Sequence, residues 1–242
     1  MPPHATTLLL AAAPALFWLW FFRRKDRFEP EPRALVFRVF LLGCAAAGAV
    51  LWVRPFLEPL APRGPGFLRD TADAFLVTAI PEEVFKLLAF VLGAGFSREL
   101  DEPMDGIIYG AAAALGFASV ENALFLTQSG DPLLLVVRGF TATLGHVAFT
   151  ATAAFGFAVW RLKPTARRLR FLLRCLVLSW LAHGGYDLFL FNQEGLHLVS
   201  LLGLLPVALL CLSLKLRWSE RQAPLYHRST VLGTAGAALT RK

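Results

Sequence analysis

Residues 34–53 read ALVFRVFLLGCAAAGAVLWV, a run of 20 residues in which Arg38 is the only charged side chain. A helix needs about 20 predominantly apolar residues to cross the hydrocarbon core of a bilayer. This run has that length and that composition. The stretch therefore predicts a membrane-spanning helix and an integral membrane protein.

The composition of the whole chain supports the same class of protein. Of its 242 residues, 56% are hydrophobic and only 17% are charged, whereas about 25% of the residues of a typical soluble domain are charged. A globule of this size exposes a large surface to water and cannot hide so much apolar surface inside. The composition therefore excludes a soluble enzyme and a disordered chain.

The apolar stretches define the predicted architecture, an all-α, polytopic bundle with about seven transmembrane helices. No stretch shows the period-two alternation of a β-strand. We expect one transmembrane domain over residues 1–216, followed by a flexible cytoplasmic tail over residues 217–242. The expected spans cover residues 5–22, 34–53, 68–96, 105–128, 132–160, 170–190 and 196–216.

Lys and Arg are unevenly distributed among the connectors. Most of the 24 basic residues lie after the first span, between the fifth and sixth spans, and in the tail. Positively charged loops remain on the cytoplasmic side of a membrane. We therefore expect the amino terminus outside and the carboxyl terminus inside. The net charge of +7 then reflects topology, and no nucleic-acid partner is expected.

A short polar motif interrupts the third span. Pro81 is followed by Glu82 and Glu83, and Lys86 lies four and three residues after these two acids. This spacing lets both carboxylates reach one ammonium group on a helix, and Pro81 should kink that helix. An ion pair that locks two helices together would need only one carboxylate. The second leaves a net negative charge that requires a proton, a metal or a water molecule.

Further ionisable residues lie inside the next three spans. Each charged group costs at least about 2.5–3.5 kcal/mol at the bilayer centre and so needs a partner or a function. The depths of the groups within their spans predict that they meet in one layer with the Glu-Glu motif. This second set comprises Glu121 beside Asn122, His146, and the pair His183 and Asp187, four residues apart.

Other intramembrane or near-membrane charges have simpler interpretations. Arg38, Arg138 and Arg174 lie near the ends of spans, so we expect their side chains to extend to the lipid headgroups. Asp101 and Asp105 flank Pro103 at the start of the fourth span, where they are expected to cap a helix.

Three classes of function are compatible with these residues. In peptide hydrolysis, a Glu takes a proton from water while a His stabilises the oxyanion or protonates the leaving amine. If a metal such as zinc is used, His146 and His183 with Glu83 or Glu121 supply plausible ligands, although the HExxH pair is absent. Proton or cation transport through buried carboxylates and a non-catalytic membrane scaffold are the alternatives.

Taken in order, these motifs resemble the PrsW family of intramembrane proteases. The resemblance rests on Glu82-Glu83-x-x-Lys86, Phe117-x-x-x-Glu121-Asn122, His146 and His183-x-x-x-Asp187, and it covers about residues 70–190. It implies a multi-pass protease of the bacterial inner (plasma) membrane with a protease-like core over about 68–190. The best-known relative makes the first cut in a membrane-anchored anti-sigma factor, which implies a single-pass membrane protein as substrate.

The resemblance leaves the mechanism open. PrsW-like proteins are classified as metalloproteases, whereas the distantly similar CAAX prenyl endopeptidases suggest a glutamate mechanism without metal. That wider group also contains a scaffold subunit of gamma-secretase. We expect Glu83, with Glu82 as partner or alternate, to activate water, and Lys86 to position the pair. Completing the site as ligands or oxyanion stabilisers are Glu121, His146 and His183, with Asp187 orienting His183.

Overall fold

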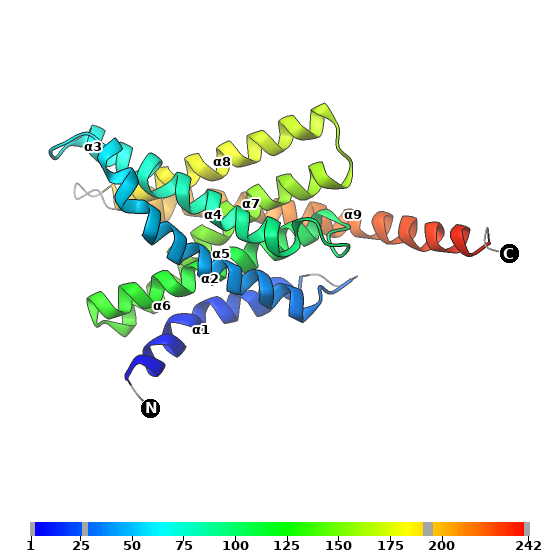
Figure 1. Cartoon of the computed structure of the whole chain (residues 1–242), viewed down its shortest axis with the longest axis horizontal. Coiled ribbons are helices and arrows are strands. Elements are labelled where there is room, and N and C mark those ends of the chain that lie inside the picture. Colours follow the sequence, from blue (N-terminus) through cyan, green and yellow to red (C-terminus); the bar gives the residue numbers. More distant parts are fainter. Residues whose placement is uncertain (1–2, 26–28, 191–195, 240–242) are drawn as a thin grey trace.

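The computed structural model describes residues 3–25, 29–190 and 196–239, and within this part of the chain it contains helices and no strand. The all-α prediction is thus confirmed for these residues. The helices lie along one long direction in Figure 1, which places their ends at two opposite faces. In chain order the elements are α1 Pro3–Arg23, α2 Arg33–Leu57, η1 Glu58–Leu60, α3 Phe67–Ala72, η2 Asp73–Ala79, α4 Ile80–Phe90, η3 Val91–Gly95, α5 Pro103–Ser129, α6 Pro132–Phe140, α7 Ala142–Leu162, α8 Ala166–Leu190, η4 Val199–Leu204 and α9 Leu205–Leu239.

Four helical segments of the described chain are long and apolar enough to cross a membrane. They are Arg33–Leu60, Pro103–Ser129, Pro132–Leu162 and Val199–Ala223. The other three expected spans also coincide with helices, namely α1, the continuous run from α3 to η3, and α8. The count of seven spans stays a prediction. Helix α9 continues past residue 216, where we expected the last span to end.

The centre of the bundle is α5. It packs against α1, α2 and α7, and its stretch from Ile107 to Leu115 is fully buried. Small residues allow such close packing between membrane helices. At the crossing with α2, a side chain on Gly116 would collide with the carbonyl oxygen of Phe40. Gly106 and Gly110 face Ala154 and Ala158 of α7 in the same way.

The third expected span is one continuous helix with irregular turns. Residues Asp73–Ala79 form a π-helix, and α4 begins at Ile80 with Pro81 in its first turn. A second π-turn, Val91–Gly95, follows α4. The irregularity that we predicted at Pro81 therefore lies in the turns immediately before it. Because Pro81 lies inside this continuous helix and has no N–H, one carbonyl of the preceding turn lacks its α-helical donor.

The fifth expected span coincides with the helical segment Pro132–Leu162, which is long and apolar enough to cross a membrane, but this segment is not one regular helix. The backbone leaves the helical conformation at Thr141, with φ −116° and ψ −89°, and this separates α6 from α7. At this break, the carbonyl of Gly139 accepts a hydrogen bond from Trp18 Nε1 at 2.8 Å. In an unbroken helix the same carbonyl would accept from the backbone N–H four residues later.

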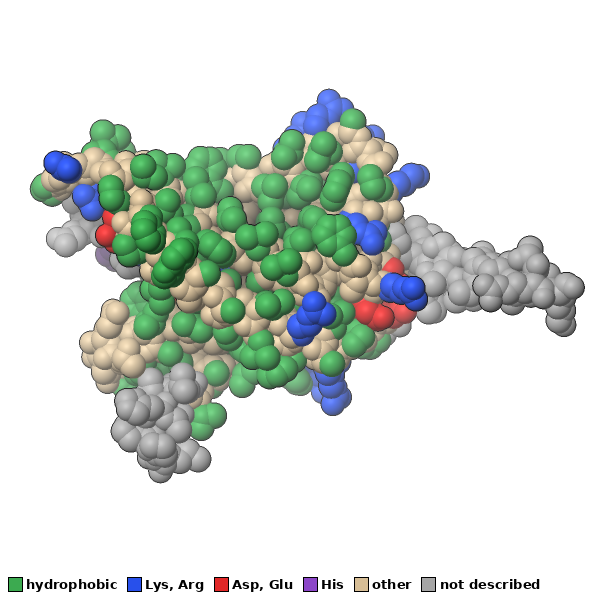
Figure 2. Space-filling view, viewed as in Figure 1, with side chains coloured by type: hydrophobic (Ala, Val, Ile, Leu, Met, Phe, Trp, Pro, Cys, Tyr) green, Lys and Arg blue, Asp and Glu red, His purple; other side chains and the backbone are tan. Residues whose placement is uncertain are grey.

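The outer surface has the character expected of a protein in lipid. Large apolar side chains are widely exposed on it, with Trp52 at 72% and Leu202 at 74%. In Figure 2 they cover the middle of the visible face, and Lys and Arg gather mostly toward the end that holds the α7–α8 turn. An exposed apolar surface of this extent is unusual for a soluble protein and typical of a membrane protein.

Candidate functional site

The structure brings the seven predicted site residues together from four helices of the bundle. Glu82, Glu83 and Lys86 come from α4 and Glu121 from α5. His146 lies on α7, and α8 contributes His183 with Asp187 one turn later. Because α4, α5, α7 and α8 all pack in one bundle, side chains that avoid lipid converge at its interior.

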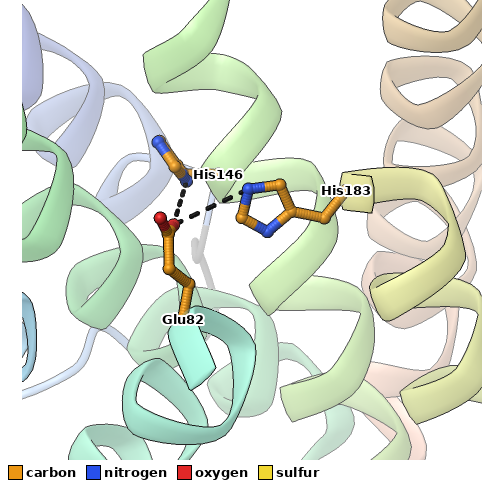
Figure 3. Close-up of side chains that lie close together, drawn as sticks. All are labelled: Glu82, His146 and His183. Atoms are coloured by element: carbon orange, nitrogen blue, oxygen red, sulfur yellow. Dashed lines mark ion pairs between the residues drawn. The ribbon is translucent and has the colours of Figure 1, made fainter. Parts of the chain in front are cut away.

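Three of these side chains form the centre of the site. Figure 3 shows Glu82, His146 and His183 pointing toward one another from three helices. Glu82 Oε2 lies 3.9 Å from His146 Nδ1 and 3.6 Å from His183 Nε2. One potential ligand atom from each residue lies within 4.8 Å of the other two. All three side chains are buried.

Glu83 has quite different surroundings from its neighbour. Its Oε1 accepts from Lys86 Nζ at 2.6 Å and pairs with His183 Nδ1 at 2.8 Å. Its Oε2 accepts from the hydroxyls of Thr150 and Ser179, both at 2.9 Å. Each carboxylate oxygen thus has two partners, which accounts for about all the acceptor capacity of the group. These four contacts hold the Glu83 carboxylate in place.

Lys86 joins the two carboxylates as its spacing predicted. It is fully buried, and its Nζ lies 3.4 Å from Glu82 Oε2 and 2.6 Å from Glu83 Oε1. The same nitrogen lies 3.0 Å from His146 Nδ1 and 4.6 Å from the centre of the Phe117 ring. An ammonium group can only donate hydrogen bonds, so Nδ1 of His146 accepts and its Nε2 carries the hydrogen.

The two histidines have parallel hydrogen-bonding arrangements. Nε2 of His146 donates to Glu121 Oε2 at 2.9 Å, while Nδ1 of His183 pairs with Glu83. Each imidazole is therefore held at one nitrogen by a carboxylate and presents the other nitrogen to Glu82. Asp187 Oδ2 also lies 3.3 Å from His183 Nε2. Carboxylates that hold the non-ligating nitrogen fix the tautomer and orientation of metal-binding histidines.

Arg138 is the member of the site that sequence reasoning missed. We expected its side chain to reach the headgroups, but it is buried and its Nη2 donates to Glu121 Oε2 at 2.8 Å. Its Nε donates to Asn122 Oδ1 at 2.9 Å, so Glu121 is paired with a cation. The available signal was the charge balance, because four acids and one Lys inside the bundle leave a need for a second cation.

A cavity of about 750 Å³ leads to this centre. Its inner end is lined by Glu82, His146 and His183, with Glu121, Arg138 and Asp187 around them. Its mouth lies near α3, where Arg54 pairs with Glu58 at 3.3 Å and with Asp73 at 3.6 Å. Glu83 and Lys86 are not among the lining residues. The cavity thus exposes Glu82 and both histidines while the second carboxylate stays behind them.

The acids at the start of α5 lie outside this site. Asp105 accepts from the backbone N–H of Glu102 at 2.7 Å and of Asp101 at 2.9 Å, and Glu102 is the N-cap of the capping box. Asp105 therefore caps the helix as expected, whereas Asp101 does not occupy the capping position. Glu31 also accepts from the Tyr109 hydroxyl here.

Comparison with known proteins identifies relatives of the chain. A family model described as PrsW family intramembrane metalloprotease matches residues 31–213. The chain is 31% identical to a protein named Protease PrsW from Geobacillus kaustophilus over 75% of this chain and 78% of the relative. It is 30% identical to Protease PrsW from Bacillus subtilis, over 74% and 79% of the two chains.

A third Protease PrsW, from Clostridioides difficile, is 27% identical over 75% of this chain and 78% of the relative. No solved structure matches the chain at a significant level. The family match extends over most of the helical bundle, including every residue of the polar cluster. The chain therefore belongs to the PrsW family of intramembrane metalloproteases and is a membrane-embedded protease.

Proposed function

We propose that the protein hydrolyses a peptide bond of a membrane protein substrate at the inner end of the cavity. One observation carries this proposal: two histidines, each held at one nitrogen by a carboxylate, present their other nitrogens to Glu82. A preorganised carboxylate and two oriented imidazoles can move protons and stabilise developing charge. The cavity gives water and an unfolded peptide segment a way to reach them.

Glu82, rather than Glu83, is proposed to activate the attacking water. Glu82 borders the cavity, its Oε2 faces both imidazoles, and no hydrogen bond to its Oε1 is found among the described residues. Glu82 Oε1 would take the proton of the water and return it to the nitrogen of the leaving amine. All four acceptor positions of Glu83 are engaged, so this residue is proposed to hold Lys86 and His183 in place.

The donor set fits a divalent metal such as zinc. Zinc in proteins is bound by histidine nitrogen and carboxylate oxygen, and Glu82 Oε2, His146 Nδ1 and His183 Nε2 supply these donors. When bound, such a cation supplies Lewis-acid chemistry to a carbonyl group or a water molecule. Lys86 would then give up its hydrogen bond to His146 Nδ1 and keep its contacts with the two glutamates. Without a metal, His183 protonated at Nε2 would stabilise the oxyanion.

The remaining polar residues have supporting roles in this proposal. Asp187, 3.3 Å from His183 Nε2, orients that ring and can serve as a further oxygen ligand. Glu121 holds Nε2 of His146, so the opposite nitrogen faces Lys86 and Glu82.

We further propose the placement of the chain in a bacterial inner (plasma) membrane. The α7–α8 turn and the helix ends on either side of it carry Arg161, Lys163, Arg167, Arg168 and Arg170. By the positive-inside rule this end is cytoplasmic, which gives seven spans over residues 1–216, an outer amino terminus and a cytoplasmic tail over residues 217–242. The cavity then opens outward, which suits a cut in or near the outer part of a single-pass substrate, such as a membrane-anchored anti-sigma factor.

Metal analysis of the purified protein is the experiment that tests this mechanism. About one zinc or other divalent ion per chain is expected, and a strong chelator should remove both the ion and the cleavage of a co-reconstituted anti-sigma factor. Adding the ion back should restore cleavage, whereas His183→Ala should bind the ion weakly. A fully active protein with no bound metal would establish the glutamate mechanism instead.

Two further results would favour the other classes of function. Ion flux through proteoliposomes, abolished by Glu82→Gln, would indicate a transporter. Loss of an assembled complex without loss of any cleavage would indicate a scaffold. A protease predicts neither, and it predicts cleavage that His146→Ala abolishes while the protein remains folded in detergent.

A further inference from the structure

We propose that Arg138 is a positioning residue of the protease site, which holds Glu121 in the orientation that fixes His146. This inference rests on the proposed function and extends it to a residue outside the four family motifs described above. Arg138 lies on α6, three residues before the break at Thr141, and is one of the lining residues of the cavity.

The guanidinium of Arg138 is attached on two edges and one face. Its Nη2 donates to Glu121 at 2.8 Å, and its Nε donates to Asn122 at 2.9 Å. The Arg138 Cζ atom lies 3.7 Å from the centre of the Phe125 ring. The planar, forked guanidinium suits simultaneous hydrogen bonding and stacking, which a lysine ammonium cannot reproduce. The position is therefore specific for arginine.

Arg138 is linked to His146 through one oxygen atom of Glu121. Glu121 Oε2 accepts from Arg138 Nη2 and also from His146 Nε2 at 2.9 Å. The Glu121 side chain is 24% exposed, at the cavity wall. Without Arg138 this carboxylate could rotate toward water in the cavity. Nε2 of His146 would then lose its acceptor, and the ring would lose the contact that directs Nδ1 toward Glu82.

A second connection runs from the same arginine to the helix that carries His146. The side-chain oxygen Oδ1 of Asn122 accepts from Arg138 Nε, and Nδ2 of Asn122 donates to Thr143 Oγ1 at 3.2 Å. Thr143 is one turn before His146 on α7. Arg138 is thus connected to His146 in two ways, through the carboxylate of Glu121 and through the side-chain amide of Asn122. The result is a hydrogen-bonded network that joins α5, α6 and α7 beside Glu82.

A buried ion pair that only joins α5 to α6 would show the same distances, so the test must separate positioning from packing. A double-mutant cycle in kcat does this, with Arg138→Gln, Glu121→Gln and the combined variant. If Arg138 acts through Glu121, the combined variant is no slower than the slower single variant, because the second change removes an effect already lost.

The matched control is Arg38→Gln. Arg38 is also an arginine within an expected span, but its side chain is exposed and donates to the Leu92 carbonyl at 2.9 Å. Loss of a residue that orients a metal-binding histidine typically costs about 10–100-fold in activity or metal affinity. We therefore expect Arg138→Gln to lower kcat by about 10–100-fold, with little change in KM, while Arg38→Gln retains the wild-type kcat.

Two measurements keep the inference testable if Arg138→Gln folds poorly. Arg138→Lys keeps the buried charge but loses the fork, so its kcat should lie between those of the wild type and Arg138→Gln. The affinity for Co²⁺, measured by competition with a chelator, should fall with kcat in both variants. Melting temperatures in detergent should show the Arg138→Lys variant to be as well folded as the Arg38→Gln control.

Several outcomes would overturn the inference. These are a kcat of Arg138→Gln equal to that of the control, effects of Arg138→Gln and Glu121→Gln that multiply in the combined variant, or an Arg138→Lys variant that is fully active. Failure of the proposed function looks different, because the wild type itself would then neither cleave nor bind metal. A wild type that cleaves, together with an equally active Arg138→Gln variant, rejects only the role of Arg138.

Discussion

Glu82 and Glu83 are adjacent in the sequence but have different surroundings. Glu82 borders the cavity and faces two imidazoles, whereas Glu83 is engaged by Lys86, His183 and two hydroxyls. Two neighbouring helical residues point about 100° apart, so only one of them can face the cavity. At the scale of single residues, we therefore assign Glu82 to catalysis and Glu83 to the stability of the site.

Substituting the two glutamates should therefore have different consequences. Glu82→Gln should reduce kcat by about 10²–10⁴-fold, the usual contribution of a general base, with a small effect on folding. Glu83→Gln should lower the free energy of unfolding by about 3–5 kcal/mol, because it leaves buried cationic partners uncompensated. Cleavage assays and reversible unfolding in SDS measure the two effects. Equal stability of both variants would contradict the assignment.

The hydroxyls that hold Glu83 give a second prediction. Thr150→Val removes a donor to Glu83 Oε2 that lies at 2.9 Å, and this should cost about 1–3 kcal/mol of unfolding free energy. Thr152→Val is the matched control, since Thr152 is also buried on α7 but donates to the carbonyl of Ala148. Unfolding in SDS compares them. The prediction fails if Thr152→Val is the more damaging change.

At the scale of elements, the α2–α5 crossing depends on glycine. A Cβ atom at Gly116 would collide with the backbone of Phe40, whereas one at Gly48 on α2 would meet no atom within 4 Å. Gly116→Ala should destabilise the protein by about 1–3 kcal/mol through overpacking, while Gly48→Ala should be neutral or stabilising. Thermal unfolding in detergent checks the pair. A neutral Gly116→Ala variant would mean that the two helices separate easily.

The elements also show what the sequence could and could not predict. The positions of Glu82, Glu121, His146 and His183 followed from the cost of charge in lipid, since each group had to face the interior of the bundle. The pairing of Arg138 could not be predicted in this way. It depends on the break at Thr141, and the break is accompanied by a hydrogen bond from Trp18, which is 121 residues away from its acceptor.

The choice between Glu82 and Glu83 was similarly beyond a local pattern. Both acids can reach Lys86 on one helix, and both do. Their difference depends on the rotation of α4 against α7 and α8, which supply Thr150 and Ser179. Nothing in a single sequence indicates which carboxylate a hydroxyl group on a distant helix will contact.

At the scale of the whole molecule, the two ends of the bundle should lie on opposite sides of the membrane. In a variant that lacks the three native cysteines, Arg63→Cys near the cavity mouth and Lys163→Cys in the α7–α8 turn provide labelling sites. An impermeant maleimide should label the first in intact spheroplasts and the second only after permeabilisation. Both positions are exposed. The reverse pattern would overturn the orientation, and labelling of both from one side would overturn the number of spans.

The packing on the side of the site away from the cavity mouth has a consequence for the cell. Lys86, Phe90, Leu115 and Ala154 are fully buried there, and Phe117 is nearly so. Water that enters through the cavity therefore meets a dry plug beyond Glu82, and hydrated ions in hydrocarbon-like surroundings carry a large free-energy penalty. In the proposed arrangement, hydrolysis would proceed partway into the bilayer while the membrane stays electrically insulating, so the enzyme would work without discharging the proton gradient across it.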